Sequence, residues 1–430
     1  MAKVITTELQ HSGASGANIT LDSSKNVTCE NNLQVDGNVT VTGTLPADKL
    51  TGNLPAISGA SLTGITSQDT LSFRNLIING GMNVAQRNYG GSSTSTGYQT
   101  VDRFKLETNG VDEAITQAKH ALTSSDTGPW AKGFRSSYHL TNGNQTGGAG
   151  ATDMANINYK IEAQDIANSG WDYTSASGKI TLSFWAISSV AQTFQITLFA
   201  EDATYGYTTE FALSANTWTK VTKTIPGHAS LAFTNNNDEG LNIIWYQFIG
   251  TDYTDSGATT DAWGTWNGGT TRKDMTSTWW TTNDATFELT GVQLEVGDTA
   301  TEFEHRTFAD ELRRCQRYYY YINGDTDDYI STSFAQSSSN MFSIVTHPVP
   351  MRYKPTFTGN AVALRHYSDN SSANFNADQL AISHQHVNWY WGLGTFNSVL
   401  YESTSSMTGG QAGLLQCQGD GVKLEFDAEL

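Results

Sequence analysis

The sequence predicts a mainly β protein built from short N-terminal strands, an antiparallel β-sandwich, one connecting helix and a C-terminal β domain. Three observations support this prediction. Charged residues make up only 15% of the 430 residues, which is unfavourable for long surface helices. Aromatic residues make up 11%, so substantial packed cores can form. Apolar and polar residues alternate over many short runs that are separated by turn-forming residues.

The opening 65 residues contain apolar pairs whose members lie two positions apart, at Ile19/Leu21, Val27/Cys29, Leu33/Val35 and Val39/Val41. This spacing is typical of short strands joined by tight turns. The motif Thr-Gly-x-Leu-Pro-Ala follows at 42–47 and again at 51–56. Because such thin strands cannot bury their apolar side chains alone, we expect several copies of the chain to wind around a common axis. A flexible linker is the alternative, and the regular apolar spacing argues against it.

The region from Phe73 to about Phe303 predicts an antiparallel β-sandwich, because helical periodicity is weak and strand-length runs recur. In 287–296 the alternation changes phase near Gly291, which predicts a β-bulge or bend. The run 241–249 is apolar on both faces, as in a central strand. Three further runs show strand patterns: 181–187, 193–199 and 217–225.

One amphipathic helix is predicted over 308–321. Thr307 is a suitable N-cap, acidic residues follow in the first turn, and arginines lie nearer the end, which suits the helix dipole. Asn323-Gly324 is expected to end the helix. The apolar stripe that predicts it consists of Phe308, Leu312, Cys315 and Tyr319.

A second, smaller β domain is predicted after the helix, with strand patterns in 341–345, 357–364, 387–391 and 422–426. The domain boundaries that follow from the whole pattern are 1–66 for the N-terminal segment, 67–305 for the sandwich, 306–322 for the helix connector and 323–430 for the C-terminal β domain.

The charge balance and the cysteines exclude several functions. The chain has 42 acidic and 24 basic residues and a net charge of −18, so nucleic acid is not an expected partner. Its three cysteines are isolated and indicate neither a disulfide framework nor a metal knuckle, which suits assembly in a reducing cytoplasm. No secretion leader and no membrane-spanning stretch is recognisable, so we expect no membrane insertion.

Three groups of residues together carry a resemblance: the opening strands 18–41 with the Thr-Gly-x-Leu-Pro-Ala copies, residues 75–82 with Gln86-Arg87 and 101–104, and residues 292–297 with 301–306 and 309–319. They resemble tail fibre and receptor-binding proteins of tailed bacteriophages, especially those of marine and cyanobacterial phages. The resemblance covers about the first 320 residues.

The resemblance implies a homotrimeric fibre with a short intertwined β shaft, a jelly-roll sandwich like that of carbohydrate-binding modules, and a receptor-binding tip. It implies further that the N-terminus attaches to the phage tail or an adaptor protein, within the virion, after assembly in the host cytoplasm. The short shaft favours a short or adaptor-mounted fibre. We expect adsorption to a host glycan or glycoprotein without modification of it.

Two other functions stay open, a glycan depolymerase or deacetylase and a structural tail adaptor. The sequence contains no GxSxG, HExxH, P-loop or GxGxxG motif at a suitable place, so an enzyme is not expected. Two carboxylates at a suitable separation would nevertheless suffice for a glycosidase.

Aromatic residues are the candidates for glycan binding, because sugar C–H faces stack on flat rings while polar side chains hold the hydroxyls. A single tryptophan is more often a packing residue than a binding residue. The candidates are Trp389, Tyr390, Trp391 and Tyr401 in the tip, and Trp263, Trp266, Trp279 and Trp280 in the sandwich.

Two groups are candidates for metal binding, although no cofactor is required. His384 and His386 alternate along one expected strand, so three chains could gather six imidazoles around a threefold axis, as His-x-His pairs do for iron in some phage fibres. Asp325, Asp327 and Asp328 could hold calcium, although the Gly and distal Glu of an EF-hand are missing. Exposed histidines and a solvated turn are the plainer interpretations.

Overall fold

The computed structural model describes residues 74–338, 340–359, 408–417 and 419–430, together with short strands at 8–9, 19–21, 27–29, 364–367, 380–382 and 397–403. The chain forms two compact units, 1–65 and 66–430. No helix in the described part of the chain is long and apolar enough to cross a membrane.

The first unit contains a small antiparallel sheet of three strands, β1 (Glu8–Leu9), β2 (Ile19–Leu21) and β3 (Val27–Cys29). The apolar pairs at 19/21 and 27/29 therefore lie in strands as predicted. The pairs at 33/35 and 39/41 and both Thr-Gly-x-Leu-Pro-Ala motifs lie outside the described residues. The winding of several copies around an axis stays a prediction.

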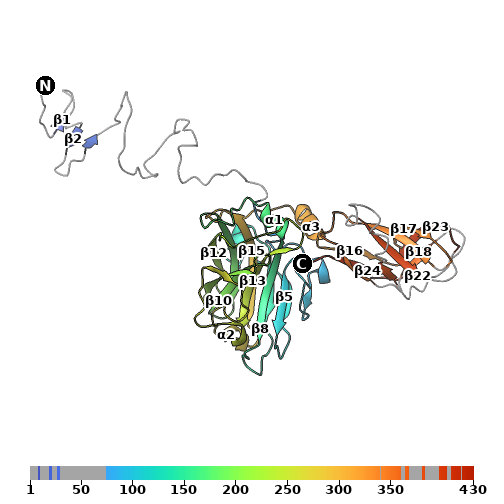
Figure 1. Cartoon of the computed structure of the whole chain (residues 1–430), viewed down its shortest axis with the longest axis horizontal. Helices are drawn as coiled ribbons and strands as arrows, with labels where there is room; N and C mark the ends of the chain where they lie inside the picture. Colours follow the sequence, from blue (N-terminus) through green and yellow to red (C-terminus); the bar gives the residue numbers. More distant parts are fainter. Residues whose placement is uncertain are drawn as a thin grey trace. The chain divides into compact units, whose positions relative to one another are not determined.

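The second unit begins with an antiparallel sandwich of two six-stranded sheets (Figure 1). One sheet has the order β14 (Trp263–Thr265), β11 (Tyr205–Leu213), β10 (Gln192–Ala200), β13 (Glu239–Ile249), β8 (Met154–Glu162) and β5 (Lys105–Asn109). The other has the order β12 (Thr219–Pro226), β9 (Lys179–Ser188), β15 (Thr286–Val296), β7 (Ser136–Thr141), β6 (Thr116–Ala121) and β4 (Ser92–Ser93). The predicted mainly β architecture is confirmed.

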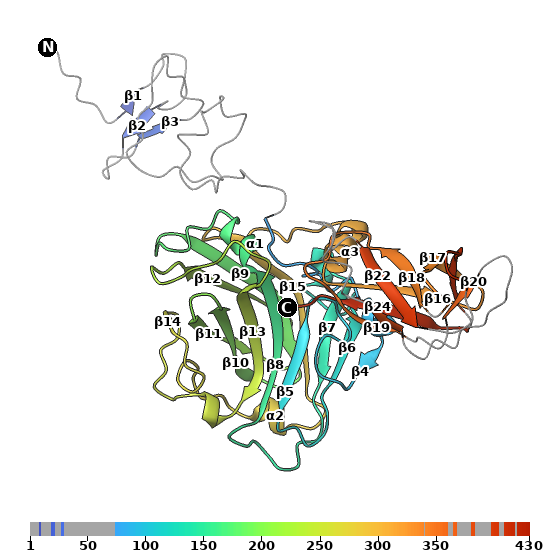
Figure 2. The ribbon, with the colours of Figure 1, turned by 45° about the vertical axis from the view of Figure 1, so that its right-hand side comes forward.

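The two sheets of the sandwich lie face to face (Figure 2). Large apolar side chains from both sheets fill the space between them. Phe194 of β10 packs on Phe287 of β15 with their ring centroids 5.2 Å apart, and Phe184 of β9 packs edge-on against Trp245 of β13 at 6.0 Å. Strand β13 is buried from its second residue to its last, as predicted for 241–249. Short helical turns lie at α1 (Ala163–Ala167), α2 (Thr278–Thr281), η3 (Arg87–Gly90), η4 (Trp130–Lys132) and η5 (Thr251–Tyr253).

The β-bulge predicted near Gly291 is present. The register between β15 and β9 shifts between Thr290 and Gln293, and Gly291 has a φ of +63°. A Cβ at this position would come within 2.6 Å of the Phe134 ring. Glycine is therefore required both for the backbone conformation and for the space.

The connecting helix α3 spans Phe308–Gln316, so the prediction of a helix to residue 321 is wrong at its C-terminal end. Its start is confirmed, because the Thr307 side chain accepts a hydrogen bond from the Asp310 amide as an N-cap. Residues Tyr319–Gly324 form strand β16 and pair with the last strand of the chain. Tyrosines favour strands, and local periodicity could not reveal a partner about a hundred residues away.

The C-terminal domain contains two antiparallel sheets. The smaller has the order β16 (Tyr319–Gly324), β24 (Val422–Asp427) and β19 (Thr356–Gly359). The larger has the order β20 (Leu364–Tyr367), β23 (Ala412–Cys417), β17 (Tyr329–Ala335), β18 (Asn340–Thr346), β22 (Asn397–Ser403) and β21 (Leu380–Ile382). The strands predicted at 341–345 and 422–426 are confirmed, and 387–391 lies outside the described residues.

A buried polar network joins this domain to the sandwich. Arg103 forms an ion pair with Glu429, and its guanidinium carbon lies 3.4 Å from the centre of the Tyr318 ring. Arg87 pairs with Asp427 at 2.9 Å and with Glu429 at 3.2 Å. Burial opposes the charge of Arg103, but Glu429 keeps the pKa of Arg103 above its usual range. The C-terminal segment is therefore tied to the sandwich by charge-assisted hydrogen bonds.

Residues of the other two groups that carry the resemblance, 75–104 and 292–319, contact one another next to this network. The side-chain amide of Asn79, a residue with a φ of +61°, donates to the carbonyls of Val84 and Asp102 at 2.8 and 2.9 Å. The backbone amide of Asn79 donates to Glu311 of α3 at 2.6 Å. Arg306 donates to the carbonyl of Ile77 at 3.0 Å. These motifs therefore fix the structural connection between the domains.

Candidate functional site

The candidate site is a cleft in the C-terminal domain where the chain passes from one sheet to the other. Strand β16 belongs to the smaller sheet and β17 to the larger. The turn between them is closed by the Asp328 amide, which donates to the carbonyl of Asp325 at 3.0 Å, and by the Asp325 amide, which donates to the Asp328 carboxylate at 2.9 Å. Because consecutive strands join different sheets, a wedge-shaped space opens between them.

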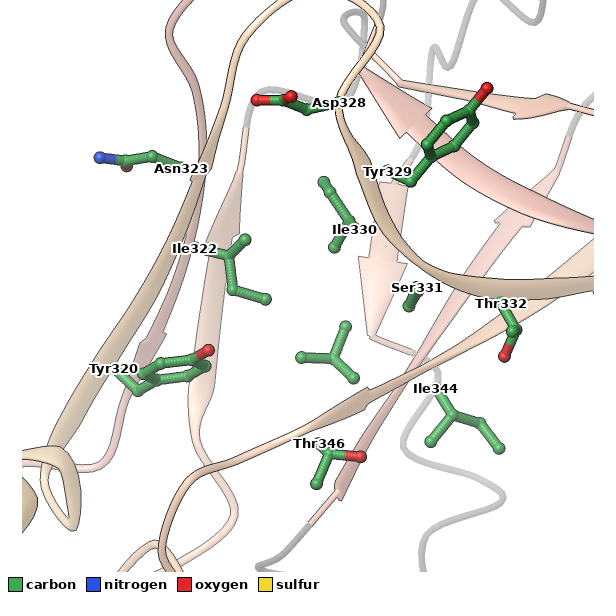
Figure 3. Close-up of a pocket in the computed structure, with 11 residues that line it drawn as sticks. Tyr320, Ile322, Asn323, Asp328, Tyr329, Ile330, Ser331, Thr332, Ile344 and Thr346 are labelled. Carbon is green, nitrogen blue, oxygen red and sulfur yellow. The ribbon is translucent and has the colours of Figure 1, made fainter.

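This cleft has a volume of about 500 Å³, within the range of about 300 to 1,000 Å³ that small-molecule sites occupy (Figure 3). Its lining comes from β16, the turn, β17 and β18. The lining residues are Tyr320, Ile322, Asn323, Asp328, Tyr329, Ile330, Ser331, Thr332, Ile344, Val345 and Thr346.

The floor of the cleft is apolar. Ile322 and Ile330 point into the space between the strands (Figure 3), and Val345 is buried beside them. The Tyr320 ring packs on the Phe426 ring with their centroids 6.1 Å apart, and burial raises the pKa of Tyr320. These contacts connect the floor to the small core of the domain.

The rim of the cleft combines aromatic and polar groups. Tyr329 is 55% exposed at the start of β17, while Thr332 and Thr346 are exposed on neighbouring strands. Asn323 and Asp328 lie near the turn at one end of the cleft (Figure 3). An apolar floor with hydroxyl, amide and carboxylate groups at its edge can accept the C–H surface of a ligand and hold its hydroxyl groups.

Among the described residues that line the cleft, Asp328 supplies the single carboxylate. Hydrolysis of a glycosidic bond ordinarily uses two carboxyl groups about 5 to 10 Å apart. Asp328 already accepts a hydrogen bond from the Asp325 amide. The described lining therefore supplies groups for holding a ligand and lacks the usual pair for cleaving a sugar bond.

The four candidate tryptophans of the sandwich lie in or against packed structure. Trp279 and Trp280 are 0% exposed, so their rings serve the core and offer no face to a sugar. Trp263 is 9% exposed and its indole N–H donates to the Pro226 carbonyl at 2.6 Å. Trp266 is half-buried and packs on Phe199, with ring centroids 4.8 Å apart. Trp266 is thus the most accessible of the four.

The other predicted residues lie largely outside the described chain. This applies to Trp389, Tyr390 and Trp391 and to the metal candidates His384 and His386. Tyr401 lies in β22, where its backbone pairs with Phe342 of β18. Their proposed roles stay predictions.

The three aspartates considered for calcium each accept a separate hydrogen bond. The Asp325 carboxylate accepts from the Gly421 amide at 3.1 Å, Asp327 accepts from the Gln416 side chain at 3.3 Å, and Asp328 accepts from the Asp325 amide. Asp327 also has a left-handed backbone with a φ of +73°. The described geometry assigns these carboxylates to closing the turn.

Sequence reasoning missed the cleft residues Tyr320 and Tyr329. Tyr320 was assigned to the helix, and the strand at 329–335 was not recognised. The available signal was the Asp-rich turn at 325–328 between two runs of β-branched and aromatic residues, which is a strand–turn–strand pattern.

Comparison with known proteins gives no family. No family model matches the chain, and no curated protein sequence matches it. Among solved structures, an enzymatically active domain of tailspike protein 4 from bacteriophage CBA120 is 11% identical, with 52% of this chain and 22% of the tailspike chain covered and a TM-score of 0.27. The match thus spans about a fifth of the length of that tailspike chain.

Two carbohydrate-binding domains are similar at the same low level. The cellulose-binding domain of a β-1,4-glucanase from Cellulomonas fimi is 14% identical, with 50% of this chain and 97% of that chain covered and a TM-score of 0.22. The family 11 carbohydrate-binding module of a Clostridium thermocellum cellulase is 10% identical, with coverages of 50% and 98% and a TM-score of 0.23. We take no functional assignment from these similarities.

Proposed function

We propose that this chain is a receptor-binding tail fibre protein of a tailed bacteriophage and holds a host-surface glycan or glycoprotein in the cleft between β16, β17 and β18. The observation that carries the proposal is the cleft of about 500 Å³ with its apolar floor and its rim of aromatic and hydroxyl groups. The resemblance of the 75–82, 101–104 and 292–319 stretches to phage fibre proteins supports the virion setting.

Binding without modification is the preferred form of the proposal. Asp328 is the one carboxylate among the described lining residues of the cleft, and a glycosidase site ordinarily needs two. The alternatives, a depolymerase or deacetylase and a structural adaptor, predict different products: released sugar or acetate in the first case, and capture of another virion protein in the second.

A homotrimer is part of the proposal. Among the described residues, Phe334 and Leu414 lie exposed on the neighbouring strands β17 and β23, outside the cleft lining. Association of copies would cover such a surface, and three weak glycan sites acting together would raise the avidity by several powers of ten. Sedimentation of the full chain measures the mass directly, and a monomer would contradict this part.

The decisive experiment compares two exposed tyrosines in the full-length protein. Tyr329→Ala removes the aromatic ring at the cleft rim, whereas Tyr353→Ala removes an equally exposed ring outside the cleft. We expect binding to host cells or their isolated surface polysaccharide to fall about tenfold for Tyr329→Ala and to stay unchanged for Tyr353→Ala, because ring contacts are worth about 1 kcal/mol or more. Equal binding by both variants would contradict the cleft as the site, provided that their melting temperatures match.

A further inference from the structure

Three adjacent strands of the sandwich bring two histidines and a glutamate together on one face. His120 lies on β6, His139 on β7 and Glu288 on β15. The register places Glu288 directly opposite His139, while His120 lies opposite Ser137. Their sequence neighbours Tyr138, Leu140, Phe287 and Leu289 are buried in the core. Because side chains alternate along a strand, the three polar groups share the outer face of the sheet.

The distances between the three side chains suit a shared ion. The Nδ1 atom of His139 lies 3.0 Å from Glu288 Oε1, and the Nδ1 atom of His120 lies 3.1 Å from Glu288 Oε2. One ligand atom from each of the three residues lies within 4.8 Å of the other two. Metal–ligand bonds of about 2.0 to 2.2 Å around one tetrahedral ion place the ligand atoms roughly 3.5 Å apart. Small side-chain rotations therefore suffice to bring the three ligands onto one ion.

Surrounding groups orient the ligands. Thr141 Oγ1 lies 3.0 Å from His139 Nε2, so the other ring nitrogen, Nδ1, faces Glu288. The Ser137 hydroxyl donates to Glu288 at 2.5 Å. Although burial acts against it, hydrogen bonds from His139 and Ser137 lower the pKa of Glu288 to about 2. Outer partners of this kind commonly position histidine and carboxylate ligands at metal sites.

Solvent can reach the cluster from one side. The side chain of His120 is 49% exposed, whereas those of His139 and Glu288 are 21% and 12% exposed. An ion could therefore enter from water next to His120 and keep a water molecule in its remaining coordination position. Imidazole nitrogen with one carboxylate is a donor set that suits zinc and similar divalent transition metals better than calcium or magnesium.

We propose that His120, His139 and Glu288 form a binding site for a divalent transition-metal ion of the zinc type. The site is separate from the cleft of the C-terminal domain and does not depend on the proposed receptor-binding function. Binding would replace the contacts of the two imidazoles with Glu288 and would link β6, β7 and β15 through one ion. The proposed site is also distinct from the predicted metal pair His384 and His386, which lies elsewhere in the sequence.

The test uses the metal-free full-length chain and Zn²⁺ as the probe. Isothermal titration is carried out on the parent, on His120→Ala and on the control His228→Ala, whose histidine stacks on Tyr205 away from the cluster. All three proteins also carry the substitutions His384→Ala and His386→Ala, which remove the other predicted metal-binding pair. We expect the parent and the control to bind one ion tightly and His120→Ala to bind it about 100-fold more weakly.

Thermal unfolding gives a second readout. Zn²⁺ should raise the melting temperature of the parent and of the His228→Ala control, and should not raise that of His120→Ala or Glu288→Gln, because an ion bound only by the folded state stabilises it. His120 is half-exposed, so its replacement by alanine leaves the core intact. Equal affinity and an equal melting shift in His120→Ala and the control would overturn the proposal.

Discussion

The sandwich and the C-terminal domain bury their apolar residues to different degrees. Five of the large apolar side chains that are exposed in the described chain, Tyr329, Phe334, Ile344, Tyr353 and Leu414, lie after helix α3. Val296 is the corresponding example in the sandwich strands. The sandwich core extends across two six-stranded sheets, whereas the described residues of the smaller domain form a core of about ten buried side chains. Within the described residues, apolar side chains are thus exposed more often in the smaller domain than in the sandwich.

This difference suggests a division of roles. The sandwich holds the joint residues Arg87 and Arg103 in place, and the smaller domain presents the cleft at the other side of the joint.

Matched core truncations should affect the two domains differently. Phe426 and Phe184 are both fully buried, Phe426 among Tyr320, His347 and Phe357. Replacing either by alanine should cost about 3 to 5 kcal/mol of unfolding free energy. In Phe426→Ala this loss should unfold the C-terminal domain while the sandwich stays protected in hydrogen exchange. In Phe184→Ala both domains should stay folded, with a lower unfolding transition for the sandwich. Simultaneous loss of protection in both domains of Phe426→Ala would contradict the independence of the sandwich.

Breaking the joint should have the next largest effect. Arg103→Ala removes the buried guanidinium that contacts Glu429 and Tyr318. Loss of one partner of a buried ion pair typically lowers the free energy of unfolding by about 3 to 5 kcal/mol. We expect a loss at the lower end of this range because Glu429 retains its ion pair with Arg87. Chemical denaturation should then separate into two transitions. The control is Arg135→Ala, whose exposed guanidinium lies over the Trp130 ring and should cost less than about 1 kcal/mol. Similar losses of unfolding free energy in both variants would show that the buried ion pairs between the two domains contribute no more to stability than an exposed arginine does.

Much of the sandwich could be predicted from local patterns. Alternation identified β9 and β10, the fully apolar run identified β13, and the phase change identified the bulge at Gly291. Each of these features depends on residues that are close in sequence. The end of α3 was wrong because Tyr319–Gly324 is drawn into a sheet by Val422–Asp427, a partner that no local pattern reveals.

The candidate site was much less predictable. Tryptophans were chosen by residue type, but Trp279 and Trp280 are fully buried and Trp263 nearly so. The cleft depends on two consecutive strands entering different sheets, and the cluster of His120, His139 and Glu288 depends on strand register. Both are long-range features, whereas residue type and spacing report only local structure.

Acid should weaken the two domains in different pH ranges. Burial lowers the pKa of His347 in the C-terminal domain to about 4, below the usual value of about 6.5. The folded state therefore favours the neutral form of His347. The free energy of unfolding is unaffected by this residue above pH 6.5 and falls as the pH drops toward 4, by at most about 3 kcal/mol. Glu288 in the sandwich, with a pKa of about 2, loses its contribution only between about pH 4.5 and 2.

Hydrogen exchange between pH 7 and 4.5 measures this order of events. The C-terminal domain should lose protection first, and His347→Phe should reduce the loss because phenylalanine can keep the ring contacts with Tyr320 and Phe426. An unchanged pH dependence in His347→Phe would rule out His347 as the cause.

The smallest effect is expected at the helix that connects the two domains. Thr307→Ala removes the oxygen that accepts from the Asp310 amide at 3.2 Å, and the loss of such an N-cap costs about 1 kcal/mol. Thr307→Ser keeps the hydroxyl and should keep most of the stability. Because Glu311 in the first turn of α3 accepts from the Asn79 amide, fraying of the helix should also reduce the hydrogen-exchange protection of residues 75–82. If Thr307→Ala lowered protection only within α3 itself, the helix would be a passive linker, and the coupling of the two domains would have to come from Arg87 and Arg103 alone.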